Sequence, residues 1–313
     1  MTSEAAPRLI TIGETMTLVT PASAEPLGTA TDFRLDAGGA ESNLASHLSH
    51  LGVRAAWVSA VGDDALGERL RATISARGVD TRWVTSDAEA PTGVYFKDPG
   101  DGVLYYRRSS AASRMGPETV RDVPLEASEI VHLTGITPAL SPSCSDLVDS
   151  VVERVAASSA TLSFDVNHRA ALWPRGAASP TLRSLANRAD IVFVGLDEAH
   201  TLWGTETADD VRAILPEPER LVVKDGEIGA TEFYRADGTD ERVFVATTPA
   251  DVVEAVGAGD AFAAGYLAAA LRGEAASDRL AAGHARARLV LQSTSDFIIE
   301  VEELIIDPDK QKG

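Results

Sequence analysis

Short apolar runs alternate along the chain with longer stretches in which apolar residues recur at helical spacing. The short runs have the length of buried strands, and the longer stretches have the period of amphipathic helices. The predicted strands cover residues 8–13, 55–61, 130–134, 162–166, 191–194 and 221–224. The predicted helices cover residues 41–51, 65–77, 145–157, 181–187, 198–202, 208–215, 257–271 and 276–292. This alternation is typical of parallel strands in one sheet with helices on both faces.

Two segments, residues 16–35 and 92–108, break this rhythm, because apolar and polar residues alternate in them one by one. Residues 98–102 (Asp-Pro-Gly-Asp-Gly) lie inside the second segment and predict a hairpin turn. We expect the two segments to form a small β-sheet lid, built from about residues 16–37 and 92–113, on a larger α/β body. No internal repeat and no low-complexity linker divides the chain.

The balance of charge narrows the classes of partner. The chain holds 28 basic and 47 acidic residues, which gives a formal net charge of −19. Such an acidic surface repels phosphate backbones and anionic lipids, which argues against nucleic-acid and membrane partners. The single cysteine, Cys144, cannot form an intrachain disulfide. The N-terminus shows no secretory signal, and the longest apolar stretch, residues 261–271, is too short to cross a bilayer. We therefore expect a cytoplasmic protein.

The sequence around Asp260 combines small residues with the start of a predicted helix. Gly257, Ala258 and Gly259 allow a tight turn that exposes backbone amides. The first amides of a helix have no acceptor within the helix, and the helix dipole is positive there, so this turn can bind a phosphate. Asp260 can accept the proton of a hydroxyl that attacks the phosphorus. The competing interpretation is an ordinary helix start with an acidic residue.

A second motif lies about 200 residues earlier in the chain. Gly38 and Gly39 have no side chains and let the backbone approach a ligand closely. Asn43 offers both a donor and an acceptor to a sugar hydroxyl. The competing interpretation is a strand-to-helix turn with an exposed asparagine.

The two motifs, in this order and about 200 residues apart, resemble the two signatures of the ribokinase-like (PfkB) carbohydrate kinases. The resemblance runs from about Leu9 to about Phe297. It implies a single kinase domain of residues 1–313 with a ribokinase-like α/β fold, in which a three-layer α/β/α body carries a small β-sheet lid over the sugar. It also implies ATP and Mg²⁺ as cofactors, with Asp260 as the catalytic base and the preceding Gly-Ala-Gly turn around the transferred phosphoryl group.

Five segments are most similar to the 2-keto-3-deoxygluconate kinases of this family: residues 13–16, 91–95, 105–107 with 110–113, 132–137, and 165–169 with 172–173. The similarity implies substrate contacts at Gly38, Gly39, Asn43, Tyr95, Tyr105, Arg107, Ile136 and Arg169. The chemistry of the residues agrees, because a guanidinium group binds the carboxylate of a sugar acid through two parallel hydrogen bonds. Tyr105 and Arg107 are two residues apart and therefore share one face of a strand. The competing interpretation is a surface hairpin with packed tyrosines and solvated arginines, which we expect for Arg108.

The nucleotide side of the site is implied by a Lys-x-Gly-x-x-Gly stretch. The resemblance assigns cofactor contacts to Lys224, Gly226 and Gly229, together with Gly257 and Gly259. The glycines make room for the base or the phosphates, and the lysine can offset phosphate charge. The alternative is a β-hairpin with glycine at its turn positions.

The sequence departs from the family pattern at two positions. Gly195 stands where the family has an asparagine, whereas Glu198, which the resemblance links to the magnesium ion, is retained. Glu254 stands where the family has an aspartate, which leaves a monovalent-cation site near this loop in doubt. Neither departure removes Asp260, so we expect kinase activity to be retained.

The resulting hypothesis is an ATP-dependent kinase that phosphorylates the terminal hydroxyl of 2-keto-3-deoxygluconate to the 6-phosphate, a step of sugar-acid breakdown. The alternatives are another sugar kinase of the same fold, acting on fructose or ribose, and a non-catalytic sugar or nucleotide sensor. Arg107 and Arg169 favour the sugar acid, because a neutral sugar does not need two guanidinium groups. The sequence does not separate this substrate from its galactonate epimer. Exposed lid strands often pair, so we expect a homodimer through the lid sheets.

Overall fold

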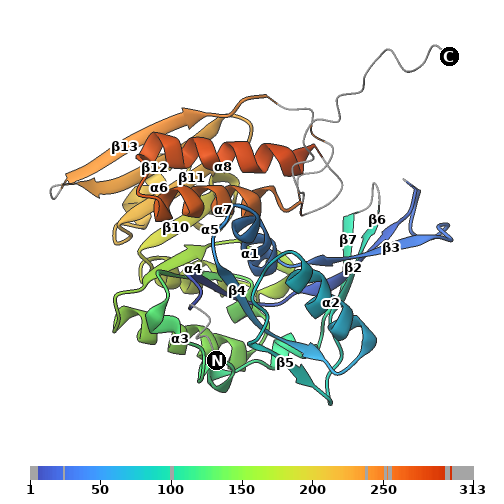
Figure 1. Ribbon diagram of the computed structural model, residues 1–313. Helices are drawn as coiled ribbons and strands as arrows, with labels where there is room; N and C mark the ends of the chain where they lie inside the picture. Colours follow the sequence, from blue (N-terminus) through green and yellow to red (C-terminus); the bar gives the residue numbers. More distant parts are fainter. Residues whose placement is uncertain are drawn as a thin grey trace, which may run out of the picture.

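The chain folds around one large sheet, and the computed structural model describes residues 6–23, 25–98, 102–236, 239–249, 252, 256–292 and 297. Within these residues, nine strands follow the order β13-β12-β11-β10-β9-β8-β1-β4-β5 (Figure 1). The strands are β1 (Leu9–Ile12), β4 (Ala55–Gly62), β5 (Val84–Asp87), β8 (Ile130–Thr134), β9 (Thr161–Asp165), β10 (Ile191–Gly195), β11 (Arg220–Asp225), β12 (Gly229–Ala236) and β13 (Thr239–Ala246). Neighbouring strands from β11 to β5 pair in parallel, which confirms the predicted parallel sheet.

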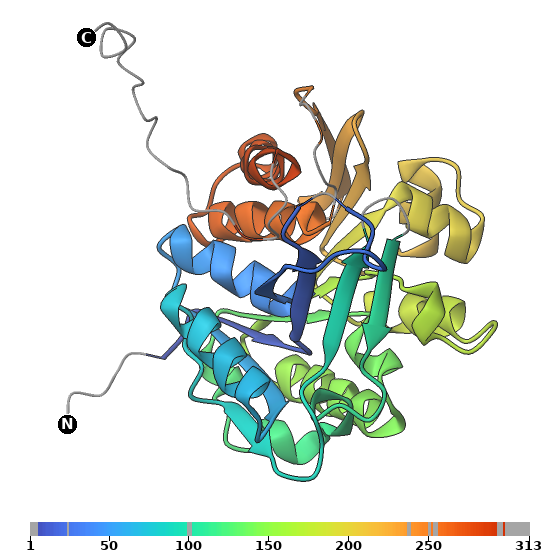
Figure 2. The same cartoon turned by 90° about the vertical axis from the view of Figure 1, so that its right-hand side faces the viewer.

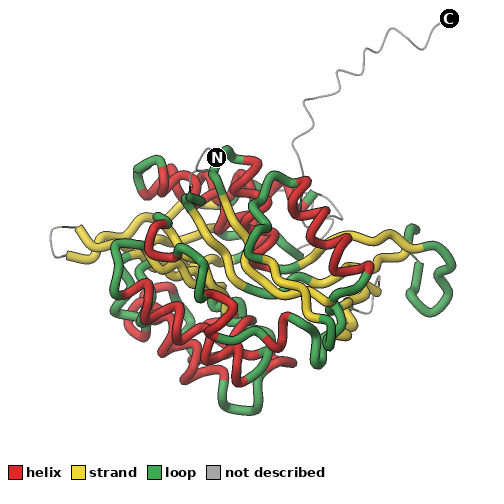
Figure 3. Tube along the Cα trace, turned by 60° about the horizontal axis from the view of Figure 1, so that its bottom comes forward, coloured by secondary structure: helices red, strands yellow, loops and turns green. Residues whose placement is uncertain are grey.

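Helices cover both faces of this sheet (Figure 3). One face is covered by α1 (Ala40–His50), α2 (Ala65–Ala76), α7 (Ala258–Leu271) and α8 (Ala276–Leu291). The other face is covered by α3 (Pro142–Ala156), α4 (Ala178–Ala186), α5 (Leu196–Trp203) and α6 (Ala208–Ile214). Consecutive residues of β1 point to opposite faces of the sheet. Leu9 packs with the first group of helices, and Ile10 packs with the second group. The predicted three-layer body is confirmed. None of the described helices is both long and apolar enough to cross a membrane.

A smaller sheet stands beside the body, and Figure 2 turns it toward the viewer. Its strands are β2 (Met16–Pro21), β3 (Phe33–Gly38), β6 (Val94–Asp98) and β7 (Gly102–Tyr106), in the order β3-β2-β6-β7. The two segments that break the alternation therefore meet in one sheet, through the parallel pairing of β2 with β6. The predicted hairpin is confirmed as the antiparallel pair β6–β7, and its turn lies outside the described residues. The action of this sheet as a lid stays a prediction.

An antiparallel ribbon at one end of the large sheet is only partly predicted by the sequence, through the alternative hairpin after Lys224. β11 turns back into β12, and β12 pairs with β13. The Lys-x-Gly-x-x-Gly stretch therefore forms the β-hairpin that its alternative interpretation predicts. Gly226 has a φ of +48° in this turn, which glycine adopts without steric cost.

The strand order places the carboxyl ends of the parallel strands along one edge. From β1 the chain builds β4 and β5 on one side and then crosses to β8 on the other side of β1. In open parallel sheets, ligands bind beyond the carboxyl ends of the strands where the order reverses. Strands β1, β8, β9, β10 and β11 bring to this edge Gly13, Thr134, Asp165, Gly195 and Lys224. The fold therefore favours this edge as the location of a ligand site.

The last two helices pack against each other at a glycine. A Cβ atom on Gly265 of α7 would stand 2.9 Å from the carbonyl carbon of Ala282 in α8 and collide with its carbonyl oxygen. The backbones of the two helices can approach this closely only because position 265 has no side chain.

The variant Gly265→Ala should lower the free energy of unfolding by roughly 1–3 kcal/mol, the usual cost of overpacking a core. Urea unfolding followed by circular dichroism measures the change. Gly28→Ala is the matched control, because a Cβ atom at position 28 meets nothing within 4 Å. Equal midpoints for Gly265→Ala and the wild type would contradict the close packing.

Candidate active site

A hydrogen bond joins the two sequence motifs. Asn43 in the first turn of α1 donates from Nδ2 to Oδ2 of Asp260 in the first turn of α7, over 3.0 Å. The helices lie against each other, although the two residues are 217 positions apart in the chain. The asparagine is only 2% exposed, which differs from the competing interpretation of an exposed asparagine.

The second polar atom of this amide remains available. Among the described residues, Oδ1 of Asn43 is buried and has no hydrogen-bond partner. A buried acceptor without a donor costs free energy, and a donor supplied by a ligand would remove that cost. The amide can therefore hold the carboxylate of Asp260 with one atom and a hydroxyl with the other.

The turn before α7 has the form that the sequence predicts. Gly257 caps the helix with a φ of +82°, in the left-handed region that glycine adopts readily. The amino group of Lys224 lies beside this turn, since a Cβ atom on Gly259 would stand 3.5 Å from its Nζ. A positive helix end and an ammonium group therefore adjoin Asp260.

Lys224 is held between carboxylates. Its Nζ donates to Oδ2 of Asp165 over 3.1 Å. Burial lowers the pKa of this lysine, but Asp165, Glu198 and Asp260 raise it by more, so the net shift is upward. The ammonium group therefore stays charged across the physiological range of pH.

Glu198 caps the start of α5. Its Oε2 accepts from the backbone N–H of Gly195, and its Oε1 accepts from that of His168, each over 2.9 Å. Burial and the nearby Asp165 raise the pKa of this carboxyl. The described residues contain no cluster of three or more histidine, cysteine, aspartate or glutamate side chains that could hold a metal ion. The departure at Glu254 lies outside the described residues.

The two glycines of the first motif make room for the small sheet. A Cβ atom on Gly38 would collide with the hydroxyl of Tyr95 and stand 2.7 Å from its Cζ. A Cβ atom on Gly39 would collide with the carbonyl oxygen of Glu14 and stand 2.8 Å from Cα of Thr15. These glycines are therefore needed where the body meets the small sheet, a reason that the sequence alone did not supply.

Tyr95 and Tyr105 stack on neighbouring strands of the small sheet. Their ring centroids lie 5.8 Å apart with an interplanar angle of 19°. Tyr95 is 5% exposed, whereas Tyr105 is 47% exposed. The guanidinium group of Arg107 lies 5.7 Å from the centroid of the Tyr105 ring, and the neighbouring Arg108 is exposed, as predicted. The sequence-predicted residues of the small sheet therefore come together.

Arg107 already has a buried counter-ion. Its Nη2 forms an ion pair with Oε2 of Glu14, and the side chains are 11% and 0% exposed. Its Nε is buried and has no hydrogen-bond partner among the described residues. The guanidinium group is therefore fixed on one side and has a donor left for a ligand.

The other two predicted substrate residues lie on the body. Arg169 is exposed in the loop after β9, where its Nη1 donates to the carbonyl oxygen of His168 over 3.2 Å. Ile136 follows β8 and is partly buried, and its N–H donates to Oγ1 of Thr134. The predicted substrate contacts thus come from both sides of the junction between the body and the small sheet.

The sequence analysis gave no role to three buried acids near the site: Glu14, Glu41 and Asp165. Two of them carried a signal. Asp165 ends a predicted buried strand, and Glu41 directly follows the small residues at a predicted helix start. Glu14 carried a weaker signal, as the polar residue after the first strand. Its pairing with Arg107 joins positions that no local pattern connects.

Glu41 is fully buried, and no cation among the described residues is bonded to it. Oγ1 of Thr134 and Oγ1 of Thr137 donate to its Oε1 over 2.7 and 2.9 Å. Its carboxyl group fills the space that a side chain on Gly13 would need. Burial raises its pKa to about 7, although the two threonine hydroxyls and the charge of Arg107 act in the opposite direction.

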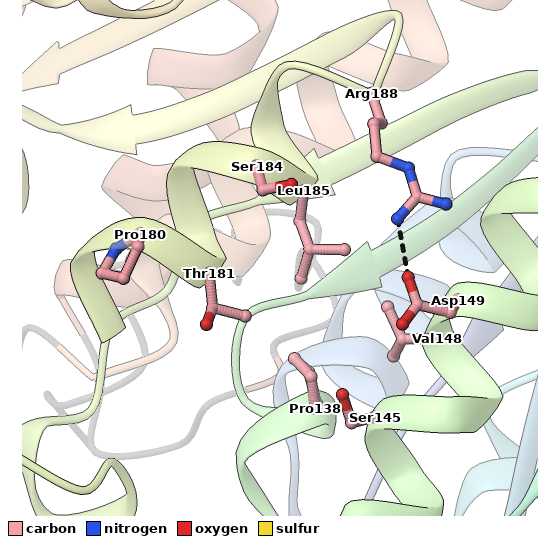
Figure 4. A pocket seen from close by; sticks show the side chains of 9 residues that line it. All are labelled: Pro138, Ser145, Val148, Asp149, Pro180, Thr181, Ser184, Leu185 and Arg188. Carbon is pink, nitrogen blue, oxygen red and sulfur yellow. Dashed lines mark hydrogen bonds and ion pairs between the residues drawn. The ribbon is translucent and has the colours of Figure 1, made fainter. Parts of the chain in front are cut away.

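A separate pocket lies between α3 and α4 (Figure 4), with a volume of about 310 Å³. It is lined by Pro138, Ser145, Val148, Asp149, Pro180, Thr181, Ser184, Leu185 and Arg188. An ion pair of 2.6 Å joins Arg188 to Asp149 at one end. None of the residues predicted for the site lines this pocket; they lie instead at the carboxyl edge of the large sheet and at its junction with the small sheet.

The raised pKa of Glu41 predicts a pH-dependent stability. The folded chain binds a proton that the unfolded chain releases between about pH 4.5 and 7, so this group's contribution falls as the pH rises through that range. Glu41→Gln mimics the protonated form and should gain stability relative to the wild type over this window, by roughly 3 kcal/mol at most. Urea unfolding from pH 5 to 8 measures the difference.

The exposed Glu68 of α2 supplies the control for that series. Glu68→Gln should give a stability curve parallel to that of the wild type. A parallel curve for Glu41→Gln as well would contradict a buried, proton-binding carboxyl at position 41.

Comparison with known proteins agrees with this geometry. Residues 6–300 match the family model described as pfkB family carbohydrate kinase. The chain is 35% identical to the 2-dehydro-3-deoxygluconokinase of Bacillus subtilis over 92% of this chain and 90% of that one. It is 30% identical to the 2-dehydro-3-deoxygalactonokinase of Haloferax volcanii over 95% and 96%.

Among solved structures, the PfkB protein from Polaromonas sp. JS666 superposes with a TM-score of 0.85 and 33% identity. The match covers 92% of this chain and 97% of that chain. The ribokinase-like fold is therefore confirmed. With a family match that spans most of its length, the chain belongs to the pfkB family of carbohydrate kinases, phosphotransferases that act on a sugar hydroxyl.

Proposed function

We propose that this kinase transfers the γ-phosphoryl group of ATP to the terminal hydroxyl of 2-keto-3-deoxygluconate (2-dehydro-3-deoxygluconate), or of its galactonate epimer. The observation that carries the proposal is the carboxylate of Asp260, held by Asn43 at the positive start of α7. The named activities of the Bacillus subtilis and Haloferax volcanii relatives support the choice of a sugar acid.

The chemistry at Asp260 begins with a proton transfer. The hydrogen bond from Asn43 favours the ionised form of the carboxylate, which then accepts the proton of the sugar hydroxyl. Oδ1 of Asn43 accepts from a hydroxyl of the sugar and orients it. The hydroxyl oxygen forms a bond to the γ-phosphorus, the bond from that phosphorus to the bridging oxygen breaks, and ADP leaves.

The turn around Gly257 and Gly259 would receive the charge of the phosphoryl group. The first amides of α7 point out of the helix start, and the ammonium group of Lys224 lies beside them. These donors are in place before the reaction, so they stabilise the developing charge without reorganisation. The hairpin turn at Gly226 and Gly229 follows Lys224 directly and would border the nucleotide.

The residues present fit a magnesium ion that arrives on the nucleotide. No cage of three metal-ligating side chains exists among the described residues, and Mg²⁺ characteristically keeps water molecules and binds through phosphates. Each oxygen of Glu198 accepts one backbone N–H and retains a lone pair, so this carboxylate would accept from metal-bound water. When bound, the ion neutralises charge on the phosphates.

The small sheet would supply the sugar-acid contacts and act as a lid. Arg107 would bind the carboxylate through donors that Glu14 leaves available, the stacked Tyr95 and Tyr105 would lie beside the sugar, and Arg169 would approach from the body. Exposed apolar side chains on the edge strands of the small sheet are compatible with a homodimer through these sheets. They are Phe33, Leu35, Leu104, Tyr105 and Tyr106.

One observation favours a second candidate, a kinase of neutral sugars such as fructose or ribose. The charge of Arg107 is already balanced by Glu14, so this guanidinium group does not itself require an anionic substrate.

A coupled ADP-release assay with ATP and Mg²⁺ separates the candidates. It compares 2-keto-3-deoxygluconate, its galactonate epimer, fructose and ribose. We expect turnover of the sugar acids only, and Arg107→Ala should raise their KM by about tenfold or more, the scale of a lost charge-assisted hydrogen bond. The exposed neighbour supplies the matched control, because Arg108→Ala should leave KM unchanged.

Asp260→Asn establishes that the activity belongs to this site. It should lower turnover of whichever sugar is used by about a hundredfold or more, the scale of general-base removal. Turnover of a neutral sugar by the wild type would contradict the sugar-acid assignment, and near-normal turnover by Asp260→Asn would contradict the assignment of the base.

A further inference from the structure

The chain passes four times between the body and the small sheet. The passages are β1 to β2, β3 to α1, β5 to β6, and β7 to the helical turn Ala112–Arg114. Any movement of the small sheet relative to the body must be accommodated in these four connections, because the two sheets share no strand.

Glu14 contacts all four connections. It lies in the first, and its carbonyl oxygen fills the space that a side chain on Gly39 would need in the second. Its Oε1 stands 3.0 Å from the place of a Cβ atom on Gly93, in the third. In the fourth, Oγ of Ser110 donates to Oε1 over 2.6 Å, and Arg107 pairs with Oε2. One residue thus lies at the centre of the junction, with its backbone against the second connection and its side chain against the third and fourth.

The contact between Glu14 and Arg107 differs from ordinary packing because Arg107 is a predicted substrate residue. Burying a charged carboxylate is costly unless an opposite charge lies beside it, and the charge beside Glu14 is that of Arg107, the residue that we expect to meet the substrate carboxylate. The pair uses Nη2 of the guanidinium group and leaves Nε buried without a partner among the described residues. Because the guanidinium group is planar and rigid, the orientation of its other donors, on Nε and Nη1, depends on Glu14.

We propose that Glu14 is the positioning residue of the sugar-acid site: it fixes the guanidinium group of Arg107 at the junction of the four connections, so that the same contact orients the substrate and sets the small sheet on the body. This inference rests on the proposed function, because it concerns how Arg107 recognises a carboxylate. Glu14 acts through Arg107 and has no part in the phosphoryl transfer.

Steady-state kinetics with 2-keto-3-deoxygluconate test this role. Glu14→Gln keeps the size of the side chain and an acceptor for Ser110 but removes the charge that holds Arg107. It should raise KM for the sugar acid by about tenfold or more, because that is roughly the effect of losing a hydrogen bond between charged groups. KM for ATP should stay within about twofold. An unchanged KM contradicts the proposal, and a lower KM does so too, because Glu14 would then compete with the substrate.

A double-mutant cycle shows whether Glu14 acts through Arg107. In an Arg107→Gln background, adding Glu14→Gln should change KM for the sugar acid by less than about twofold. A further tenfold increase would mean that Glu14 acts independently of the guanidinium group and would overturn the proposal.

Two further variants separate positioning from stability. Ser110→Ala removes a hydrogen bond from the same carboxylate without touching Arg107, so it should lower the melting temperature and leave KM unchanged. If Glu14→Gln does not fold, Glu14→Asp replaces it. The shorter arm of the aspartate withdraws the charge from Arg107, so KM should again rise.

The variant Arg107→Gln alone distinguishes a failure of the proposed function from a failure of the positioning role of Glu14. If that variant leaves KM for the sugar acid unchanged, the proposed function fails, and the positioning role fails with it. If Arg107→Gln raises KM and Glu14→Gln does not, the sugar-acid function stands and only the role of Glu14 is wrong.

Discussion

The hydrogen bond from Asn43 to Asp260 is the contact on which the arrangement of the site depends. It joins the first helix of the body to the helix that begins at the phosphate-binding turn. Each helix start is fixed separately. Gly39 places α1 where a side chain would collide with Glu14, and Gly257 caps α7 in the left-handed conformation. The two helix starts meet only because the large sheet holds both helices on the same face.

Buried charge, and not apolar packing, organises the edge at which the strands end. Lys224 balances Asp165, and Arg107 balances Glu14, so both pairs escape the cost of an isolated buried ion. Burial raises the pKa of Glu41, and its two threonine hydroxyl partners and the charge of Arg107 offset this only in part. The apolar clusters on the two faces of the sheet fix the fold, while these acids and bases define what the edge can bind.

Most of the body could be predicted from the sequence, because parallel strands are continuous apolar runs and the helices between them are amphipathic. The prediction contained no strand at β5 or β13 and gave β12 only through the alternative hairpin. β13 lies at the end of the sheet with no fully buried side chain among those described. The prediction was right for the helix starts that carry Asn43 and Asp260, since α1 and α7 begin within one residue of the predicted positions. It missed the pairing of Glu14 with Arg107 and the contact of Gly38 with Tyr95, because both join segments far apart in the chain and no local pattern records such contacts.

The most direct test of Asp260 as the catalytic base is the pH dependence of kcat/KM for the variant Asn43→Asp. Asn43 donates to Asp260 over 3.0 Å and favours its ionised form. A second carboxylate at that distance cannot ionise together with the first without a large cost, so the pair should gain a proton. We expect the acid limb of the kcat/KM profile to move upward by about one pH unit or more. A limb at the wild-type pH would contradict the assignment of Asp260, held by Asn43, as the catalytic base.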